Sequence, residues 1–246
     1  MHHVTQIELT SHCNATCAYC PYSKMLRPKG HMTLKTLKTV EKQYLKDLRD
    51  TDSYVVLNHF GEFFLHPKFE KMTKFLKKKG HLTETCSNGI LVNKENIKRC
   101  ESSLDSIVIQ WNTFDDKKLK RLDLLAKSKI GYITLRQLVQ QNRTEEYYKK
   151  LNAASLQVKG LYGDRVQIQY QAMHDWASAG CKVGNKVRAP FVGHVLCKAF
   201  TCNECCVLWD GTLVNCCYDY DGVDPIINKQ RSKKLCSSCG FDIMAL

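Results

Sequence analysis

Long apolar segments are absent from this 246-residue chain. Its longest apolar run is a handful of residues, whereas a membrane-spanning helix needs roughly 20. Hydrophobic residues make up 43% of the chain and charged residues 25%, both close to the averages of globular proteins. This composition excludes a membrane span and a disordered chain. The length suffices for one large domain and one small one.

The first residues lack the basic stretch and apolar segment of a secretion signal. We therefore expect a cytoplasmic, reducing location, in which disulfides are rare. On this expectation the 14 cysteines act as metal ligands, catalytic groups or core residues.

Acidic residues are in deficit, with 24 Asp and Glu against 37 Lys and Arg and a net charge of +13. The basic residues are dispersed over predicted helices such as 68–79, and no RNP, helix-turn-helix or His-containing zinc-finger motif accompanies them. We interpret the charge as a lysine-rich solvated surface. An acidic partner is the alternative.

Short apolar or β-branched runs predict strands at 6–9, 54–58, 82–86, 106–111, 132–139 and 166–171. Amphipathic stretches predict helices at 34–48, 68–79, 94–100, 116–127 and 145–154, with Thr33 as the N-cap of the first. This alternation predicts the α/β class, as a partial (β/α)6 TIM-like barrel over residues 1–175. The active site of such a barrel lies at the C-terminal ends of its strands.

After residue 175 the helical patterns become sparse and cysteines cluster. A hairpin is predicted from strands at 206–209 and 212–215 around Asp210-Gly211. We therefore expect residues 176–246 to form a small Cys-rich β-hairpin/helix module that bound metal stabilises.

Cys13, Cys17 and Cys20 form a C-x3-C-x2-C motif directly after the first predicted strand. Three thiolates on one short loop can bind three corners of a 4Fe–4S cluster and leave the fourth iron open. A partial zinc site is the alternative, although structural zinc sites need a fourth ligand and usually use C-x2-C pairs.

The motif and its surroundings resemble the radical SAM superfamily. The similar features are Cys13 to Cys20 (CNATCAYC), Gly61-Glu62 after the second strand, and Ser87-Asn88-Gly89 after the third. The resemblance implies that the open iron binds S-adenosylmethionine. Its reductive cleavage would give a 5′-deoxyadenosyl radical that abstracts a hydrogen from a substrate.

The resemblance also implies cofactor contacts. They are Tyr19 beside the adenine, Glu62 and the Gly61 backbone at the methionine ammonium, and Ser87 and Asn88 near the ribose or the methionine. One departure is visible, because Phe60 stands where the superfamily often has the first glycine of Gly-Gly-Glu. Close backbone approach is then in doubt at this position.

The C-terminal cysteines resemble the SPASM and Twitch modules of radical SAM enzymes. The matching positions are Cys197, Gly211, Cys216, Cys236 and Cys239. The resemblance implies that the four cysteines hold an auxiliary 4Fe–4S cluster, and the one-cluster Twitch version fits better.

Two alternatives use other cysteines. A zinc ribbon would pair Cys202 and Cys205 with Cys236 and Cys239. A further cluster would use the cysteines at 202, 205, 206 and 217.

Side chains alternate between the two faces of a strand, and this alternation predicts which polar groups face the barrel interior. They are Gln110, Asn112, Arg136 and either Gln169 or Tyr170. Arg136 and Gln110 are the candidate catalytic residues. An interior Arg needs an anion, so Arg136 either anchors a carboxylate or makes a structural salt bridge.

The layout resembles the branch that contains 2-deoxy-scyllo-inosamine dehydrogenase and the anaerobic sulfatase-maturing enzymes. It implies oxidation of a small molecule or modification of a peptide, with a flavodoxin or ferredoxin as reductant. A zinc-containing nucleic-acid-binding protein and an iron–sulfur electron carrier are the alternatives, and both leave Gly61-Glu62 and Ser87-Asn88 unexplained.

Overall fold

The computed structural model describes residues 3–17, 20–111, 115–139, 143–172, 204–214, 219 and 221–222. The chain divides into two compact units, each considered by itself. The first unit comprises 1–49, 55–66 and 174–246, and the second comprises 50–54 and 67–173.

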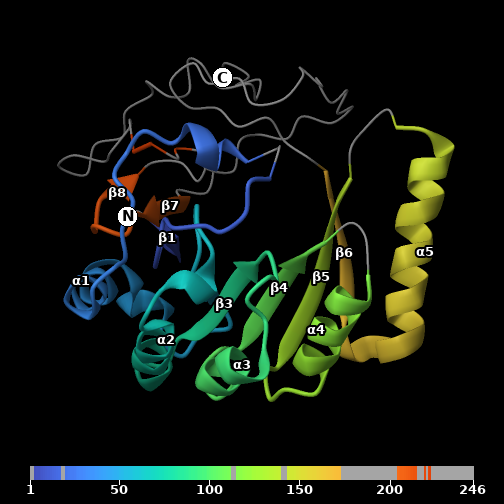
Figure 1. Ribbon diagram of the computed structural model, residues 1–246. Helices are drawn as coiled ribbons and strands as arrows, with labels where there is room; N and C mark the ends of the chain where they lie inside the picture. The colour runs from blue at the N-terminus through green and yellow to red at the C-terminus, as the bar shows by residue number, and fades with distance from the viewer. Residues whose placement is uncertain are drawn as a thin grey trace, which may run out of the picture. The chain divides into compact units, whose positions relative to one another are not determined.

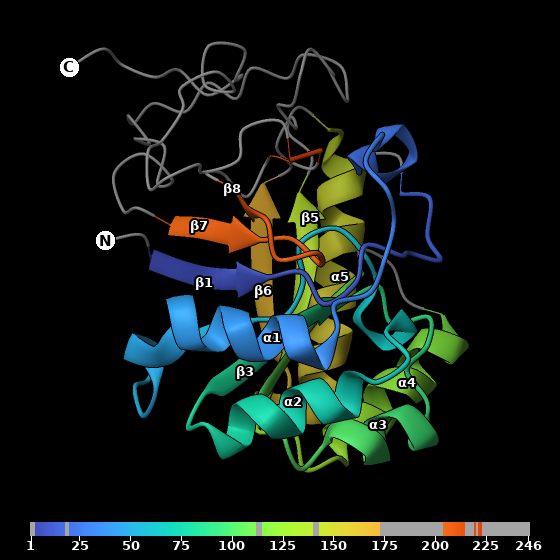
Figure 2. The same cartoon turned by 90° about the vertical axis from the view of Figure 1, so that its left-hand side faces the viewer.

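The first unit is built around β1, which has a parallel strand on either side. The strands are β1 (His3–Ile7), β2 (Tyr54–Val56), β7 (Glu204–Val207) and β8 (Leu213–Val214). β1 pairs in parallel with β2 and with β7, and β7 pairs with β8 in the antiparallel hairpin that the sequence predicts. Figure 2 shows β1 and β7 side by side. The hairpin strand β7 thus continues the sheet that β1 begins.

The helix predicted at 34–48 is not continuous. α1 (Leu34–Val40) is followed by a π-helical turn at Glu41–Leu45 and a 3₁₀ turn at Lys46–Leu48. The buried carboxylate of Glu41 accepts a hydrogen bond of 2.6 Å from Arg49 Nε, beyond the end of the helix. Wide turns of this kind insert one extra residue and redirect the side chains that follow. The N-cap prediction is confirmed, because Thr33 Oγ1 accepts from the Thr36 amide.

The second unit alternates helices with parallel strands (Figure 1). Its elements are α2 (Phe69–Lys78), β3 (Leu82–Ser87), α3 (Lys94–Cys100), β4 (Ser106–Gln110), α4 (Asp116–Ala126), β5 (Tyr132–Val139), α5 (Glu145–Tyr162) and β6 (Gln167–Ala172). The strands lie in the order β6-β5-β4-β3, and every pairing among them is parallel. This arrangement confirms the α/β class.

The helices of the second unit follow the apolar periodicity of the sequence. Phe69, Met72 and Leu76 of α2 are buried at the spacing of one helix face. α5 continues eight residues beyond the predicted end at residue 154. In this helix the buried Ser155 donates a 2.7 Å hydrogen bond to Gln137 Oε1. A Cβ added at Gly160 of this helix would meet no atom within 4 Å.

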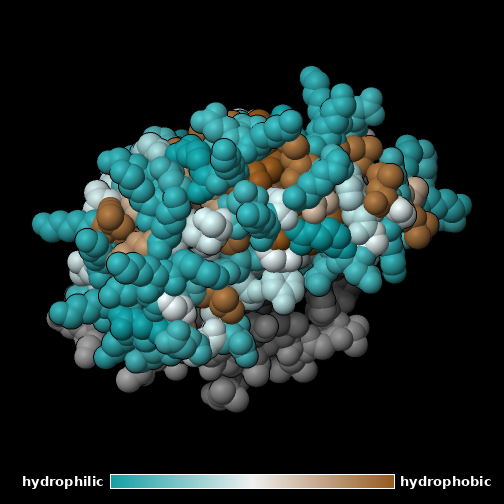
Figure 3. Space-filling model, turned by 90° about the horizontal axis from the view of Figure 1, so that it is seen from below, coloured by the Kyte–Doolittle hydropathy of each residue, from teal (hydrophilic) through white to brown (hydrophobic). Residues whose placement is uncertain are grey.

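The surface drawn in Figure 3 is mostly hydrophilic, with small separate apolar patches. Within the described part of the chain, each helix is too short or too polar to cross a membrane. The predicted boundary between residues 175 and 176 stays a prediction, since most of 176–246 lies outside the described residues.

One arginine closes the turn between α4 and β5. The guanidinium of Arg165 donates four hydrogen bonds of 2.7–3.0 Å to the carbonyl oxygens of Ala126, Ser128, Ile130 and Gly131. Hydrogen bonds from a charged group contribute more than neutral ones, and unpaired carbonyls are costly when buried.

We expect Arg165→Met to lower the free energy of unfolding by about 2–3 kcal/mol, because the carbonyls lose a shared donor. Urea denaturation followed by circular dichroism measures this change. Lys120→Met is the control, because Lys120 is exposed. Equal stabilities of the two variants would contradict the assignment.

Candidate functional site

The loop that follows β1 carries Cys13, Cys17 and Cys20, all partly exposed and all free thiols. The Cys20 amide donates a 3.0 Å hydrogen bond to the Cys17 carbonyl oxygen, which closes a tight turn between the last two cysteines. The 3₁₀ turn Pro21–Lys24 begins directly afterwards. The local backbone therefore holds the cysteines on one compact loop.

The thiols of this loop influence one another. The pKa of the Cys20 thiol is raised to about 11, chiefly by burial and in smaller part by the nearby Cys17 and Cys13. The Cys13 sulfur accepts a 3.4 Å hydrogen bond from the Ala15 amide. Three thiolates this close need a positively charged partner, and amide donors to sulfur are typical of iron–sulfur ligands.

A 4Fe–4S cluster fits this donor set better than a single ion. Within the described ranges, no three His, Cys, Asp or Glu side chains gather closely enough to hold one metal ion. The thiolates of a cubane cluster bind different iron atoms and so remain farther apart than the ligands of one ion. Three sulfurs from one loop match a cluster with one open iron.

The structure brings Gly61 and Glu62 against the cysteine loop. The Glu62 amide donates a 2.8 Å hydrogen bond to the carbonyl oxygen of His12, next to Cys13. Gly61 has φ of 139°, and a Cβ at this position would lie 2.1 Å from the Thr10 carbonyl oxygen. Only glycine permits this conformation and this approach.

Glu62 itself is buried, with 1% of its surface exposed. Its Oε1 accepts a 3.3 Å hydrogen bond from the Phe64 amide, which caps the 3₁₀ turn Phe63–Leu65.

The packing of Phe60 accounts for the phenylalanine that stands where the superfamily often has the first glycine of Gly-Gly-Glu. Its ring is buried against Met25, with Cys20 and Tyr22 packed on the same cluster. The side chain thus fills the space beneath the cysteine loop. The close backbone contact occurs one residue later, at Gly61.

Sequence reasoning missed Glu8, which lies just beyond β1 and has 0% of its surface exposed. Its carboxylate accepts from Arg27 Nη2 at 2.5 Å, from the Phe60 amide at 3.2 Å and from the Trp209 amide at 3.3 Å. Burial raises the pKa of Glu8, and Arg27 acts in the opposite direction. The signal in the sequence was an isolated acid within the apolar run Ile7-Glu8-Leu9.

Three histidines, also missed, lie behind the cysteine loop. The His12 and His31 rings stack with centroids 4.5 Å apart, and His66 meets His31 edge-on at 5.4 Å. His31 Nδ1 is 2.9 Å from Thr10 Oγ1. Burial lowers the pKa of His31, and His12 and His66 lower it further.

The remaining predicted cofactor contacts belong to the second unit, at the end of β3. The Ser87 hydroxyl accepts from the Gly89 amide at 3.0 Å, and Asn88 Oδ1 accepts from the Ile90 amide at 2.9 Å. The Asn88 carbonyl oxygen accepts from Trp111 Nε1 at 2.8 Å, and the indole packs on Gly89. Both side chains therefore shape a rigid turn, and their role toward a cofactor stays a prediction.

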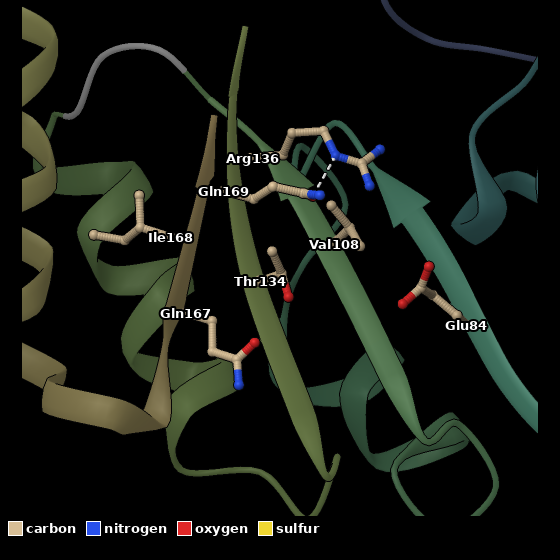
Figure 4. Close-up of a pocket in the computed structure, with 7 residues that line it drawn as sticks. All are labelled: Glu84, Val108, Thr134, Arg136, Gln167, Ile168 and Gln169. Atoms are coloured by element: carbon tan, nitrogen blue, oxygen red, sulfur yellow. Dashed lines mark hydrogen bonds between the residues drawn. The ribbon is translucent and has the colours of Figure 1, made fainter. Parts of the chain in front are cut away.

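A polar pocket of about 350 Å³ lies on one face of the second unit's strands. It is lined by Glu84, Val108, Thr134, Arg136, Gln167, Ile168 and Gln169. Figure 4 shows Arg136 and Glu84 on one side of the strands, with Ile168 pointing the other way. Arg136 Nε donates a 3.0 Å hydrogen bond to Gln169 Oε1, so Gln169 shares the face of Arg136.

Gln110 and Tyr170 complete the predicted interior positions. Gln110 pairs in register with Arg136, and its Oε1 lies 3.9 Å from the Cys86 sulfur. Tyr170 instead donates a 2.8 Å hydrogen bond to Ser155 of α5, which resolves the alternative in favour of Gln169.

Several predicted site residues lie outside the described residues. They are Tyr19, Asn112, Cys197, Cys202, Cys216, Cys217, Cys236 and Cys239. Cys205 and Cys206 are described and buried in β7, and Cys206 donates a 3.0 Å hydrogen bond to Gln6 Oε1.

A comparison with protein families matches residues 7–155 to the radical SAM superfamily, which is more than half of the chain. The chain belongs to the radical SAM superfamily. Membership implies a 4Fe–4S cluster and S-adenosylmethionine as cofactors, in agreement with the resemblance drawn from the cysteine loop.

One curated relative and several solved structures are similar to the chain. An uncharacterized protein of Methanocaldococcus jannaschii is 33% identical over 122 residues, which cover 49% of this radical SAM chain and 38% of that relative. The structure of BtrN with AdoMet and 2-DOIA is similar at a TM-score of 0.58 and 16% identity, over 93% of this chain and 78% of BtrN.

Two further structures share the fold. Streptococcus suis SuiB with S-adenosylmethionine has a TM-score of 0.53 at 12% identity, over 87% of this chain and 60% of SuiB. anSMEcpe with AdoMet has a TM-score of 0.58 at 16% identity, over 73% of this chain and 52% of anSMEcpe. At these identities the likeness shows the fold alone.

We expect Gly61→Ala to lower the free energy of unfolding by about 2–3 kcal/mol, because the added Cβ meets the Thr10 carbonyl and φ is strained. Chemical denaturation of the metal-free radical SAM chain measures the loss. The matched control is Gly160→Ala in α5, which we expect to raise stability by about 0.5–1 kcal/mol. Wild-type stability of Gly61→Ala would refute the close approach.

Proposed function

We propose that this chain cleaves S-adenosylmethionine reductively and uses the resulting 5′-deoxyadenosyl radical to abstract a hydrogen atom from a substrate. The observation that carries the proposal is the convergence of the cysteine loop with Gly61 and Glu62. Spacing alone predicts three iron ligands, and the 2.8 Å hydrogen bond from the Glu62 amide to the carbonyl oxygen of His12, the residue before Cys13, supports a common site for the two loops.

In this proposal Cys13, Cys17 and Cys20 hold the 4Fe–4S cluster, which supplies the electron that cleaves the carbon–sulfur bond of the cofactor. Glu62 accepts from the methionine ammonium, because a buried carboxylate favours a cationic partner. Gly61 allows the backbone to approach closely. Tyr19, Ser87 and Asn88 bind the adenine, the ribose or the methionine.

The polar pocket suggests where an anionic group binds. The Arg136 guanidinium uses Nε for Gln169, and no carboxylate pairs with it in the part of the chain that the structure describes. A guanidinium can bind a carboxylate with two parallel hydrogen bonds. We propose that Arg136 anchors a carboxylate of the substrate or of S-adenosylmethionine, with Gln110 beside it.

The reaction outcome that we favour is a two-electron oxidation. The substrate gives a hydrogen atom to the radical, then a proton to a base and an electron to an acceptor. A C–H bond next to oxygen or nitrogen suits this sequence, because the substrate radical is then readily oxidised. An auxiliary 4Fe–4S cluster at Cys197, Cys216, Cys236 and Cys239 would accept the electron.

The partners follow from the same proposal. Cleavage of the cofactor consumes one electron, so a flavodoxin or ferredoxin of a reducing, cytoplasmic compartment is the proposed donor. The net charge of +13 favours association with an acidic protein of this kind. The substrate is a small molecule or a peptide.

We expect replacement of Cys13, Cys17 and Cys20 by Ala to abolish formation of 5′-deoxyadenosine and to remove about four iron atoms per chain. Iron analysis and chromatography after anaerobic reconstitution measure both quantities. Cys100→Ala is the control, since this thiol is buried and burial raises its pKa to about 12. Unchanged iron content in the triple variant would overturn the assignment.

The oxidative outcome has a separate test. We expect Cys236→Ala to form 5′-deoxyadenosine from S-adenosylmethionine while losing a product two hydrogens lighter than the substrate. Mass spectrometry with candidate alcohols, amines and peptides detects this product. Full turnover in the variant would show that Cys236 is not needed for oxidation, and the reaction would then end by rearrangement or coupling.

A further inference from the structure

Glu8 has no part in the proposed contacts with the cluster or the cofactor, yet it is fully buried at the centre of the first unit. We propose that Glu8 is a positioning residue that fixes the cofactor-binding loop at Gly61-Glu62 against the cysteine loop and couples both loops to the C-terminal hairpin. The inference rests on the proposed role of Gly61-Glu62 in binding S-adenosylmethionine.

The carboxylate of Glu8 receives donors from three segments that are distant in sequence. Arg27 comes from the chain after the cysteine loop, the Phe60 amide from the loop after β2, and the Trp209 amide from the turn between β7 and β8. His59 Nδ1 lies 3.9 Å from Glu8 Oε1. A single side chain therefore sets the distance between the three segments.

The peptide of Gly61 is held on both sides. Before it, the Phe60 amide is bound to Glu8 at 3.2 Å, and after it, the Glu62 amide is bound to His12 at 2.8 Å. The Thr10 carbonyl leaves no space for a side chain at Gly61 itself. Loss of the Glu8 contact frees the segment before Gly61, so Glu62 is held less firmly against the cysteine loop.

The hairpin is attached to the same carboxylate. Besides its amide bond to Glu8, Trp209 donates from Nε1 to the Pro28 carbonyl oxygen at 3.2 Å. Its ring lies so close to Gly30 that a Cβ there would be 2.6 Å away. Gly30 in turn exchanges hydrogen bonds with Ser11, two residues before Cys13. A displaced hairpin therefore also disturbs the start of the cysteine loop.

Stability alone does not account for a carboxylate here. A buried ion pair is often no more stabilising than apolar residues of similar size, because both charges lose their hydration. A leucine cannot accept the Phe60 and Trp209 amides. Glu8 therefore has two effects. It balances the charge of Arg27, and it fixes the geometry of the Phe60 and Trp209 amides. The two effects can be tested separately.

The test compares three variants of the reconstituted full chain. Glu8→Gln keeps the shape and loses the charge. Glu8→Leu with Arg27→Met replaces the ion pair by apolar groups and removes the acceptor of both amides. Glu41→Gln is the matched control, because Glu41 is an equally buried acid paired with Arg49 in the same unit but away from the cysteine loop.

The readouts are iron content, the dissociation constant of S-adenosylmethionine, and hydrogen exchange of the peptide that contains residues 59–62. For the Glu8/Arg27 double variant we expect iron near the wild-type value, affinity for S-adenosylmethionine weakened about tenfold, and faster exchange at 59–62. For Glu8→Gln, which keeps one acceptor oxygen, we expect smaller changes in the same direction. We expect the KM for the cofactor to rise more than kcat falls. Glu41→Gln should change none of these.

Wild-type affinity and exchange in the Glu8/Arg27 double variant would overturn the proposal and leave Glu8 a purely structural ion pair. Should the double variant not fold, Glu8→Gln decides by the same two measurements. If the wild-type chain does not bind S-adenosylmethionine, the proposed function fails, while the exchange at 59–62 still tests the positioning role.

Discussion

The carboxylate of Glu8 is the contact on which the first unit depends. It is fully buried, it pairs with Arg27, and it accepts the backbone amides of Phe60 and Trp209. An unpaired charge in this position would be strongly destabilising, so the segments that bring the three donors must assemble together. The cysteine loop, the Gly61-Glu62 loop and the hairpin are then fixed by one side chain.

The α/β class was predictable because apolar periodicity is local and strong in this chain. β5 and α3 have the predicted bounds, and most other elements differ by a few residues at their ends. The break after α1 was not predictable from the apolar periodicity, and Glu41 at this point pairs with Arg49 only in the folded unit. The length of α5 was also underestimated, and its residue Ser155 bonds to Gln137 and Tyr170 in the folded unit. Tertiary contacts of this kind leave no periodic signal in the sequence.

The candidate site was predictable where covalent spacing carries the chemistry. Three cysteines within eight residues must share a loop. Position 61 requires glycine because of its positive φ and the nearby Thr10 carbonyl oxygen. Glu8 and the stacked histidines were missed, because single polar residues next to an apolar strand have no characteristic spacing. The pocket around Arg136 was predictable through strand parity, and the bond to Gln169 shows why Tyr170 takes the opposite face.

The central claim is that the loop from Cys13 to Cys20 holds a 4Fe–4S cluster whose open iron binds S-adenosylmethionine. Electron–nuclear double resonance of the reduced, reconstituted chain tests it most directly, with the cofactor carrying ¹⁵N in its amino group. We predict a ¹⁵N coupling to the reduced cluster and a changed electron resonance spectrum on addition of the cofactor. A spectrum that is unchanged by S-adenosylmethionine and shows no ¹⁵N coupling would contradict the claim.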